Sequence, residues 1–234
     1  GTVLTNSEFS RDYTARWWGL DATVIYAPAE TRIEAEGPKQ NKILSVGRFT
    51  SGGTKKRQLG MMSAYSQLNL ERWKYVSVGG LNTSLEDRTY FEMVRQAAMN
   101  ARAEVIANAD HHLLRSHYTS ASIFWHAAGF GETDYNPRLM EHFGIVTVEA
   151  MAAGCVPVVI DRGGQPEIVQ HGVNGFLWRT MDELKTITRH LASNPDVLST
   201  MSQAARRRAD HFSRDAFRRR LLAALEGAGL PKSA

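Results

Sequence analysis

Residues 141–157 read Glu-His-Phe-Gly-Ile-Val-Thr-Val-Glu-Ala-Met-Ala-Ala-Gly-Cys-Val-Pro. This pattern predicts a helix over 145–153, which Gly154 ends, followed by a strand over 157–160. Small residues near the end of the helix allow it to pack closely on a sheet: Ala150, Ala152 and Ala153. Close packing would fix the helix N-terminus near Gly144, where unpaired backbone N–H groups can receive an anion.

From about residue 40 onward, short β-branched runs alternate with longer stretches of helical period. The predicted strands are 43–47, 73–78, 103–106, 123–125, 157–160 and 175–177. Met61, Tyr65 and Leu68 recur at the spacing of one helix face and so predict a first helix. Further helices are predicted over 85–100, 110–119, 145–153 and 165–171. Such alternation is typical of an α/β domain, and we expect a Rossmann-like, doubly wound parallel sheet.

The two ends of the chain do not fit this repeat. At the C-terminal end, 181–193 and 196–225 predict two or three extra helices with no strand between them. At the other end, a strand over 2–6, a helix over 10–18 and a strand over 23–26 form a small unit.

The small N-terminal unit cannot bury its own apolar face, because Trp17 and Trp18 need a partner surface. The polar stretch that follows it is typical of a linker. We therefore expect a fragment organised as a remnant of a preceding domain (1–27), a linker (28–41) and a main domain (42–226).

Composition excludes several classes of protein. The chain has 234 residues, of which 43% are hydrophobic and 22% charged, so a disordered or collagen-like chain is excluded. No apolar run reaches the about 18 residues of a spanning helix, and there is no signal pattern, so we expect a cytoplasmic protein. A single cysteine, Cys155, excludes a disulfide framework and a thiolate zinc site made by this chain alone.

The net charge of +4 comes from one segment. Between residues 201 and 221, two aspartates accompany seven arginines: Arg206, Arg207, Arg208, Arg214, Arg218, Arg219 and Arg220. The rest of the chain is close to neutral. A solvated helix face or an interdomain contact explains this segment better than nucleic-acid binding does.

Two glycine clusters partly match the patterns of phosphate-binding loops. Gly129 and Gly131 begin a dinucleotide pattern, but Asp134 occupies the third glycine position, which disfavours an NAD-type site. The segment 47–57 also lacks the order of a P-loop. It combines a glycine turn with Arg48 and a basic run at 55–57, which suits a diphosphate, although a solvated basic helix start has the same composition.

Four other side chains are candidates for contacts with a ligand. Glu149, about one turn into its helix, can accept two hydrogen bonds from the vicinal diol of a ribose, and Glu141 can reach a neighbouring sugar. His126 ends a predicted strand, where it is either a ligand contact or a structural histidine. Glu167 either contacts a ligand or caps its own helix. The histidines at 111, 112 and 117 lack the partners of a metal site.

Several blocks together resemble family 4 retaining glycosyltransferases of the GT-B fold. Glu141 and Glu149, separated by seven residues within 141–159, look like the signature of that family. Further blocks resemble it in order: 46–49, 124–129, 163–169 and 172–177. Residues 5–9 and 24–28 resemble the end of its N-terminal domain and the crossover between domains.

The resemblance implies the C-terminal half of a two-domain enzyme, which binds a nucleotide-sugar donor. Arg48 and one lysine of the Lys55/Lys56 pair, preferably Lys56, would bind the donor diphosphate and act in catalysis with Glu141. Glu149 would hold the ribose. The remaining binding positions are Gly47, His126 and the backbone N–H groups of Phe143, Gly144 and Ile145. No metal and no cofactor are implied, and the base would contact the backbone near 105–108.

The resemblance also implies partners that the chain itself does not carry. The acceptor would bind to a missing N-terminal domain, so the fragment is expected to be inactive alone. Peripheral membrane association of the full enzyme is compatible with this reading, whereas nucleic acid is not expected. Two alternatives stay open: a GT-B epimerase, hydrolase or phosphorylase, and a non-catalytic nucleotide-binding module. The nucleobase, the sugar, the acceptor and the linkage are not specified.

Overall fold

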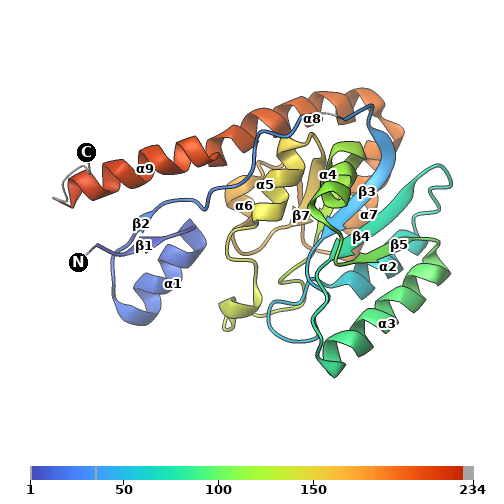
Figure 1. The fold of residues 1–234 in the computed structure, drawn as a ribbon, viewed down its shortest axis with the longest axis horizontal. Coiled ribbons are helices and arrows are strands. Elements are labelled where there is room, and N and C mark those ends of the chain that lie inside the picture. Colours follow the sequence, from blue (N-terminus) through green and yellow to red (C-terminus); the bar gives the residue numbers. More distant parts are fainter. Residues whose placement is uncertain (1, 35, 229–234) are drawn as a thin grey trace.

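The computed structural model describes residues 2–34 and 36–228. Among these residues, six parallel strands form one sheet in the order β5-β4-β3-β6-β7-β8. Figure 1 shows this sheet with helices packed around it. The strands are β3 (Gln40–Val46), β4 (Lys74–Gly79), β5 (Glu104–Ala107), β6 (Ala121–His126), β7 (Val156–Ile160) and β8 (Phe176–Trp178). Because the strand order turns back between β3 and β6, the sheet is doubly wound, as the sequence predicted.

Helices cover both faces of this sheet. One face carries α2 (Gln58–Ser66), α3 (Leu85–Ala101) and α7 (Met181–Ser193). The other face carries α4 (His111–Ser120), α5 (Ile145–Ala152) and the second half of α8 (Pro195–Ala209). The remaining elements of the main domain are η1 (Pro137–Leu139), α6 (Gln165–Ile168), η2 (Asp210–Phe212) and α9 (Arg214–Gly227).

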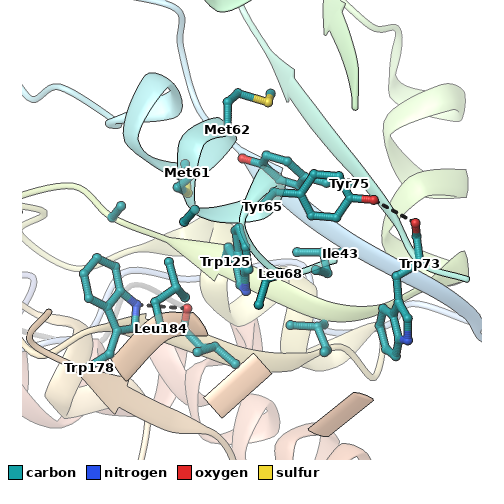
Figure 2. Packing of buried hydrophobic residues seen from close by; sticks show 14 of the residues in the cluster. Ile43, Met61, Met62, Tyr65, Leu68, Trp73, Tyr75, Trp125, Trp178 and Leu184 are labelled. Carbon is teal, nitrogen blue, oxygen red and sulfur yellow. Dashed lines mark hydrogen bonds between the residues drawn. The ribbon is translucent and has the colours of Figure 1, made fainter. Parts of the chain in front are cut away.

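Alternate residues of each strand point into two separate cores. Ile43 and Trp125 lie in the first core and their neighbours Leu44 and Phe124 in the second, all at most 1% exposed. Figure 2 shows the first core, where the ring of Trp125 lies 5.2 Å from that of Tyr75. Strands buried on both faces need apolar residues throughout, which is why short apolar runs predicted them.

Two expected boundaries of the main sheet and its helices differ from the structure by three residues. The sheet begins at Gln40, inside the predicted linker, because Gln40 pairs with Ala121 of β6. The predicted helix over 165–171 is wrong in its length, because Val169 is extended (φ −101°, ψ 122°) and α6 ends at Ile168. The division of the chain into domains stays a prediction.

A small unit precedes the main domain. Strands β1 (Leu4–Thr5) and β2 (Thr23–Val24) pair in parallel, and α1 (Glu8–Trp18) connects them. The helix begins two residues earlier than predicted because Ser7 Oγ accepts the Ser10 N–H at 3.0 Å, as an N-cap does. The expected strand, helix and strand are therefore present, with shorter strands.

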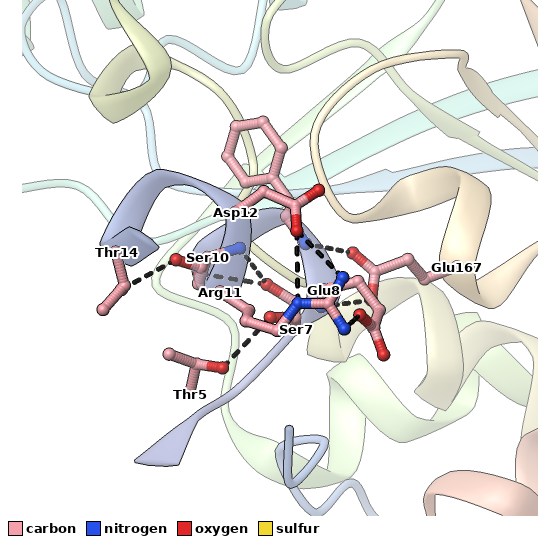
Figure 3. Close-up of polar contacts among 9 residues, drawn as sticks. Thr5, Ser7, Glu8, Ser10, Arg11, Asp12, Thr14 and Glu167 are labelled. Carbon is pink, nitrogen blue, oxygen red and sulfur yellow. Dashed lines mark hydrogen bonds and ion pairs between the residues drawn. The ribbon is translucent and has the colours of Figure 1, made fainter. Parts of the chain in front are cut away.

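Glu167 of α6 joins this unit to the main domain. Its two carboxylate oxygens accept the backbone N–H groups of Glu8 and Phe9, at 2.7 and 2.8 Å (Figure 3). These are orphan donors of the first turn of α1, so the negative charge also lies at the favourable end of the helix dipole. Glu167 thus caps α1. One interpretation of the sequence had it cap its own helix instead, which the structure does not show.

Replacing Glu167 by Gln is expected to loosen α1, because an amide leaves only one oxygen to accept these two N–H groups. Loss of a helix cap costs about 1 kcal/mol. Hydrogen exchange measured by mass spectrometry should become faster over residues 8–18 and stay unchanged in β3 and β6. Glu86→Gln is the control, since Glu86 is exposed in the first turn of α3. Equal protection of α1 in both variants would contradict the role of Glu167.

Two of the seven clustered arginines are helix caps. Arg206 donates to the carbonyls of Ala152 and Ala153 at the C-terminal end of α5, at 3.1 and 2.8 Å. Arg208 donates to the carbonyls of Ile168 and Glu167 at the end of α6, at 3.1 and 2.6 Å. These bonds satisfy carbonyls that have no partner within their helices. Part of the basic segment therefore has a structural role inside the domain.

Candidate functional site

A cleft of about 300 Å³ opens where β3 and β6 end. In doubly wound sheets, ligands bind at this edge, at the point where the strand order reverses. The walls of the cleft come from the turn after β3, the segment before α5 and the N-terminal unit. Most of the predicted site residues line it: Gly47, Arg48, Lys56, Glu141, Phe143, Gly144 and Ile145.

The N-terminus of α5 faces this cleft through Gly144, Ile145 and Val146. Within residues 2–34 and 36–228, the backbone N–H groups of these three residues donate no hydrogen bond. Gly144 adopts φ 115° and ψ 59°, a left-handed conformation that favours glycine. The helix end is therefore open to an anion.

Gln165 holds the turn at Gly144 in place, and sequence analysis gave it no role. Its Nε2 donates to the Phe143 carbonyl at 3.2 Å, and its Oε1 accepts from Thr147 Oγ1 at 2.9 Å. A Cβ on Gly144 would lie 2.2 Å from Gln165 Nε2. Gln165 is fully buried, so both bonds form away from water and fix the start of α5.

Glu141 is the centre of a charged network. Its Oε2 contacts both Lys56 Nζ and His126 Nε2, the latter at 3.1 Å. Burial alone would raise the pKa of Glu141, but the hydrogen bond from His126 and the charge of Lys56 lower this pKa well below its usual range. Burial lowers the pKa of His126. Because an ionised carboxylate can only accept, His126 donates its Nε2–H to Glu141.

Glu141 has one oxygen left for a ligand. Its Oε1 has no hydrogen-bond partner in the part of the chain that the structure describes. The backbone behind it is fixed by close glycine contacts, because a Cβ on Gly163 would lie 2.2 Å from the Glu141 carbonyl oxygen. Gly164 donates its N–H to that oxygen at 2.8 Å. Gly163 and Gly164, which begin the segment 163–169 that resembles the family, therefore position Glu141.

The turn after β3 supplies the two cations of the cleft. Arg48 is exposed, and its guanidinium has no partner among the described residues. The stem of Lys56 crosses Gly47, where a Cβ would lie 2.7 Å from Lys56 Cγ. Gln58 donates to the carbonyls of Gly47 and Arg48 at 3.2 and 3.0 Å. The absence of a side chain at Gly47 thus lets Lys56 reach Glu141.

Asp87 anchors the loop between Arg48 and Lys56, a role that sequence analysis missed. It accepts the Ser51 N–H at 3.0 Å and a hydrogen bond from Asn82 Nδ2 at 3.1 Å. These donors, Ser51 first, lower the pKa of Asp87. The carboxylate therefore stays ionised and holds the loop at neutral pH.

Three predicted residues lie outside the walls of the cleft: Lys55, His126 and Glu149. Lys55 is exposed and lines a separate pocket of about 560 Å³, together with Arg57 and Lys185. His126 lies behind Glu141, with 3% of its side chain exposed. Of the lysine pair, the structure thus brings Lys56 but not Lys55 to Glu141.

Glu149 lies one turn further along α5. It is half-buried, and its Oε2 accepts from the Tyr118 hydroxyl at 3.1 Å. Burial raises the pKa of Glu149, and burial beside this carboxylate raises the pKa of Tyr118 well above its usual value. Tyr118 was missed by sequence analysis because no local motif marks it as a partner of Glu149.

No group of three or more potential metal ligands occurs among the described residues. His117 is buried, and neither of its ring nitrogens has a partner there. Likewise, no helix within the described ranges is long and apolar enough to cross a membrane.

Comparison with known proteins adds relatives to this geometry. The family model described as "Glycosyl transferases group 1" matches residues 28–208. A "GDP-Man:Man(3)GlcNAc(2)-PP-Dol alpha-1,2-mannosyltransferase" of Dictyostelium discoideum is 28% identical over 236 residues, which cover 91% of this chain and 43% of the relative. A protein of the same name from Xenopus laevis is 24% identical, over 96% of this chain and 48% of the relative. The chain spans about half the length of these curated relatives.

Solved structures share the fold. Anabaena Alr3699/HepE in complex with UDP superposes with a TM-score of 0.81 at 20% identity, over 97% of this chain and 64% of that chain. At this identity, the likeness concerns the arrangement of helices and strands alone.

Proposed function

Because the chain belongs to the group 1 glycosyltransferases, we propose that it binds the nucleotide-sugar donor of an enzyme that transfers the sugar with retained anomeric configuration. The observation that carries this proposal is the cleft at the carboxyl end of β3, between the segment that follows β3 and the start of α5. One wall offers Arg48 and Lys56, and the other offers the unpaired N–H groups at the start of α5. Positive groups on two opposite walls suit a diphosphate.

These groups would act mainly on the leaving group. When the bond between the sugar and the diphosphate breaks, negative charge grows on the phosphate oxygens, and fixed donors stabilise that charge without reorganisation. Lys56 is paired with Glu141 and would exchange part of that contact for a phosphate oxygen. Glu141 Oε1 would accept a hydrogen bond from a hydroxyl of the sugar, and His126 would keep the carboxylate in position.

Glu149 would hold the ribose of the donor. Its Oε2 is engaged by Tyr118, which leaves Oε1 to accept from the diol. The names of the two curated relatives include GDP-Man. For this chain we therefore propose a donor in which a guanine nucleotide carries a hexose such as mannose. The proposed donor binding needs no metal and no cofactor, since the cations of the chain meet the diphosphate.

The acceptor would bind to a further domain of the full enzyme. The full enzyme would be cytoplasmic and would contact a membrane surface peripherally. Exposed arginines on α8 and α9 support the membrane contact, because they can bind anionic lipids: Arg207, Arg218 and Arg219. Co-sedimentation with anionic and neutral vesicles measures this contact, and equal sedimentation would contradict it. An epimerase or phosphorylase on the same fold is not favoured by the named relatives.

A thermal-shift titration tests donor binding. The chain is mixed with GDP, UDP and ADP in turn, and saturable stabilisation is expected, largest with GDP. A ligand at 100 times its Kd stabilises a protein by about 2.7 kcal/mol, so the shift is readily measured. Absence of stabilisation by all three nucleotides would refute the proposal.

Replacing Glu149 by Gln separates binding from folding. Burial raises the folded-state pKa of Glu149, so the ionised carboxylate opposes folding at neutral pH, and this cost disappears as the pH falls through that pKa. We expect the variant to melt at the same temperature as the wild type or higher at pH 7, because the amide oxygen still accepts from Tyr118. GDP binding should weaken about tenfold, as for loss of a charge-assisted hydrogen bond. Thermal denaturation measures the melting temperature and calorimetric titration measures the GDP affinity, both at pH 7. Unchanged GDP affinity would exclude the ribose contact.

A further inference from the structure

A second cleft of about 660 Å³ runs along α1, between this helix and the segment before α5. Its walls combine aromatic rings with polar groups, mainly Phe9, Tyr13, Trp17, Trp18, Arg138 and His142. No carboxylate lines it. The cleft therefore suits an uncharged ligand with both apolar faces and hydrogen-bonding groups.

The rings of this cleft form a continuous row. The ring of His142 lies 5.9 Å from that of Phe9, which lies 5.0 Å from that of Tyr13. Tyr13 is followed by Trp17 at 5.4 Å, and Trp17 by Trp18 at 6.3 Å. Phe9, Tyr13 and Trp17 are four residues apart and so lie on one side of α1, over a length of about 12 Å.

The outer end of the row is open. Trp17 is 46% exposed and Trp18 66% exposed, so neither ring is used by a core of the described chain. Large exposed rings of this kind mark binding surfaces. The row is also held at its two sides, because Tyr13 Oη donates to the Asp134 carbonyl at 2.9 Å and Glu167 caps the start of the helix.

The inner end of the row meets the donor cleft. His142 lines both clefts, and Asn6, which directly precedes the α1 cap, lines the donor cleft. The Nδ2 of Asn6 has no hydrogen-bond partner in the described residues, and the guanidinium of Arg138 has none either. A ligand in the second cleft would thus extend directly to the place where the donor sugar is proposed to react.

We propose that the cleft along α1 binds sugar rings of the acceptor, whose remaining part would contact the further domain of the full enzyme. This inference rests on the proposed function, because it gives the second substrate a place beside the first. A pyranose ring presents C–H groups on its faces and hydroxyls on its rim. The faces of Trp17 and Trp18 carry the negative side of the ring quadrupole, which attracts such C–H groups. Arg138 and Asn6 supply donors for the hydroxyls.

The test measures sugar binding by the chain directly. Mannotriose, maltotriose and chitotriose are titrated separately up to about 20 mM in the presence of saturating GDP, with tryptophan fluorescence and calorimetry as readouts. At least one is expected to bind saturably and to change the fluorescence. Trp17→Ala should weaken that binding about tenfold, whereas Trp17→Phe, which keeps an aromatic face, should retain most of it.

Two controls separate this inference from the proposed function. Trp17→Ala should leave GDP affinity and the melting temperature unchanged, because Trp17 does not line the donor cleft. Lys56→Met should weaken GDP binding and leave sugar binding without GDP unchanged. No saturable binding of any of the three sugars, with GDP bound normally, would overturn the inference alone. Equal sugar binding by the wild type and by Trp17→Ala would overturn it as well. So would displacement of the sugar by an octyl chain, because the cleft would then prefer an apolar ligand to a sugar.

Discussion

Replacing Lys56 by Met is expected to weaken binding of GDP about 10- to 100-fold, the range for loss of a charge-assisted hydrogen bond. Lys56 is one of the two cations in the cleft, and its ammonium already lies at Glu141 Oε2, where a carboxylate holds it next to the start of α5. Methionine keeps the length of the stem that crosses Gly47 and removes only the charge. Calorimetric titration of GDP at low and high salt measures the change.

Lys55→Met is the matched control for this experiment. Lys55 is adjacent in sequence and carries the same charge, but it is exposed and lines a different pocket. Its replacement should change GDP affinity less than about twofold, because exposed charges are screened by salt. If the Lys55 variant lost affinity and the Lys56 variant did not, the diphosphate would have to lie on the other side of the loop.

Replacing Gly144 by Ala is expected to lower the free energy of unfolding by about 2 to 4 kcal/mol and to abolish detectable nucleotide binding. Two effects add at this position. An L-residue is strained at φ 115°, and the new Cβ would lie 2.2 Å from Gln165 Nε2. Gln165 would have to move, which releases the Phe143 carbonyl and turns the N–H groups of α5 away from the cleft. Urea denaturation measures the loss of stability.

Gly172→Ala provides the control for backbone strain alone. Gly172 has φ 76°, and nothing lies within 4 Å of a Cβ built there. This variant should lose about 1 kcal/mol and bind GDP normally. Equal losses in the two variants would show that the contact with Gln165 is not important.

The fold could be predicted because its signals are local. Strands β4, β6 and β7 are short apolar runs, and each was expected within a few residues of its position. The stop of α5 at Gly154 also follows from nearby sequence, although the reason for its missing side chain does not. A Cβ there would lie 2.5 Å from Arg206 Nε, which comes from another helix.

The braces of the site could not be predicted, because their partners are far apart in the chain. Glu167 accepts hydrogen bonds from residues 159 and 158 positions away. Tyr118 and Glu149 are 31 positions apart, and Asp87 reaches back 36 positions to Ser51. Family resemblance pointed to Glu141 and Lys56, but only the three-dimensional structure brings their side chains together.

One turn of helix, α6, sets the geometry of both proposed substrate sites. Gln165 at its start fixes the Gly144 turn, and Glu167 two residues later fixes α1. Arg208 ties down the other end of the same turn. The relative position of the two proposed sites is thus fixed by a helix of only four residues. An insertion or deletion there would shift the start of α5 against the start of α1, and would therefore disturb both proposed sites at once.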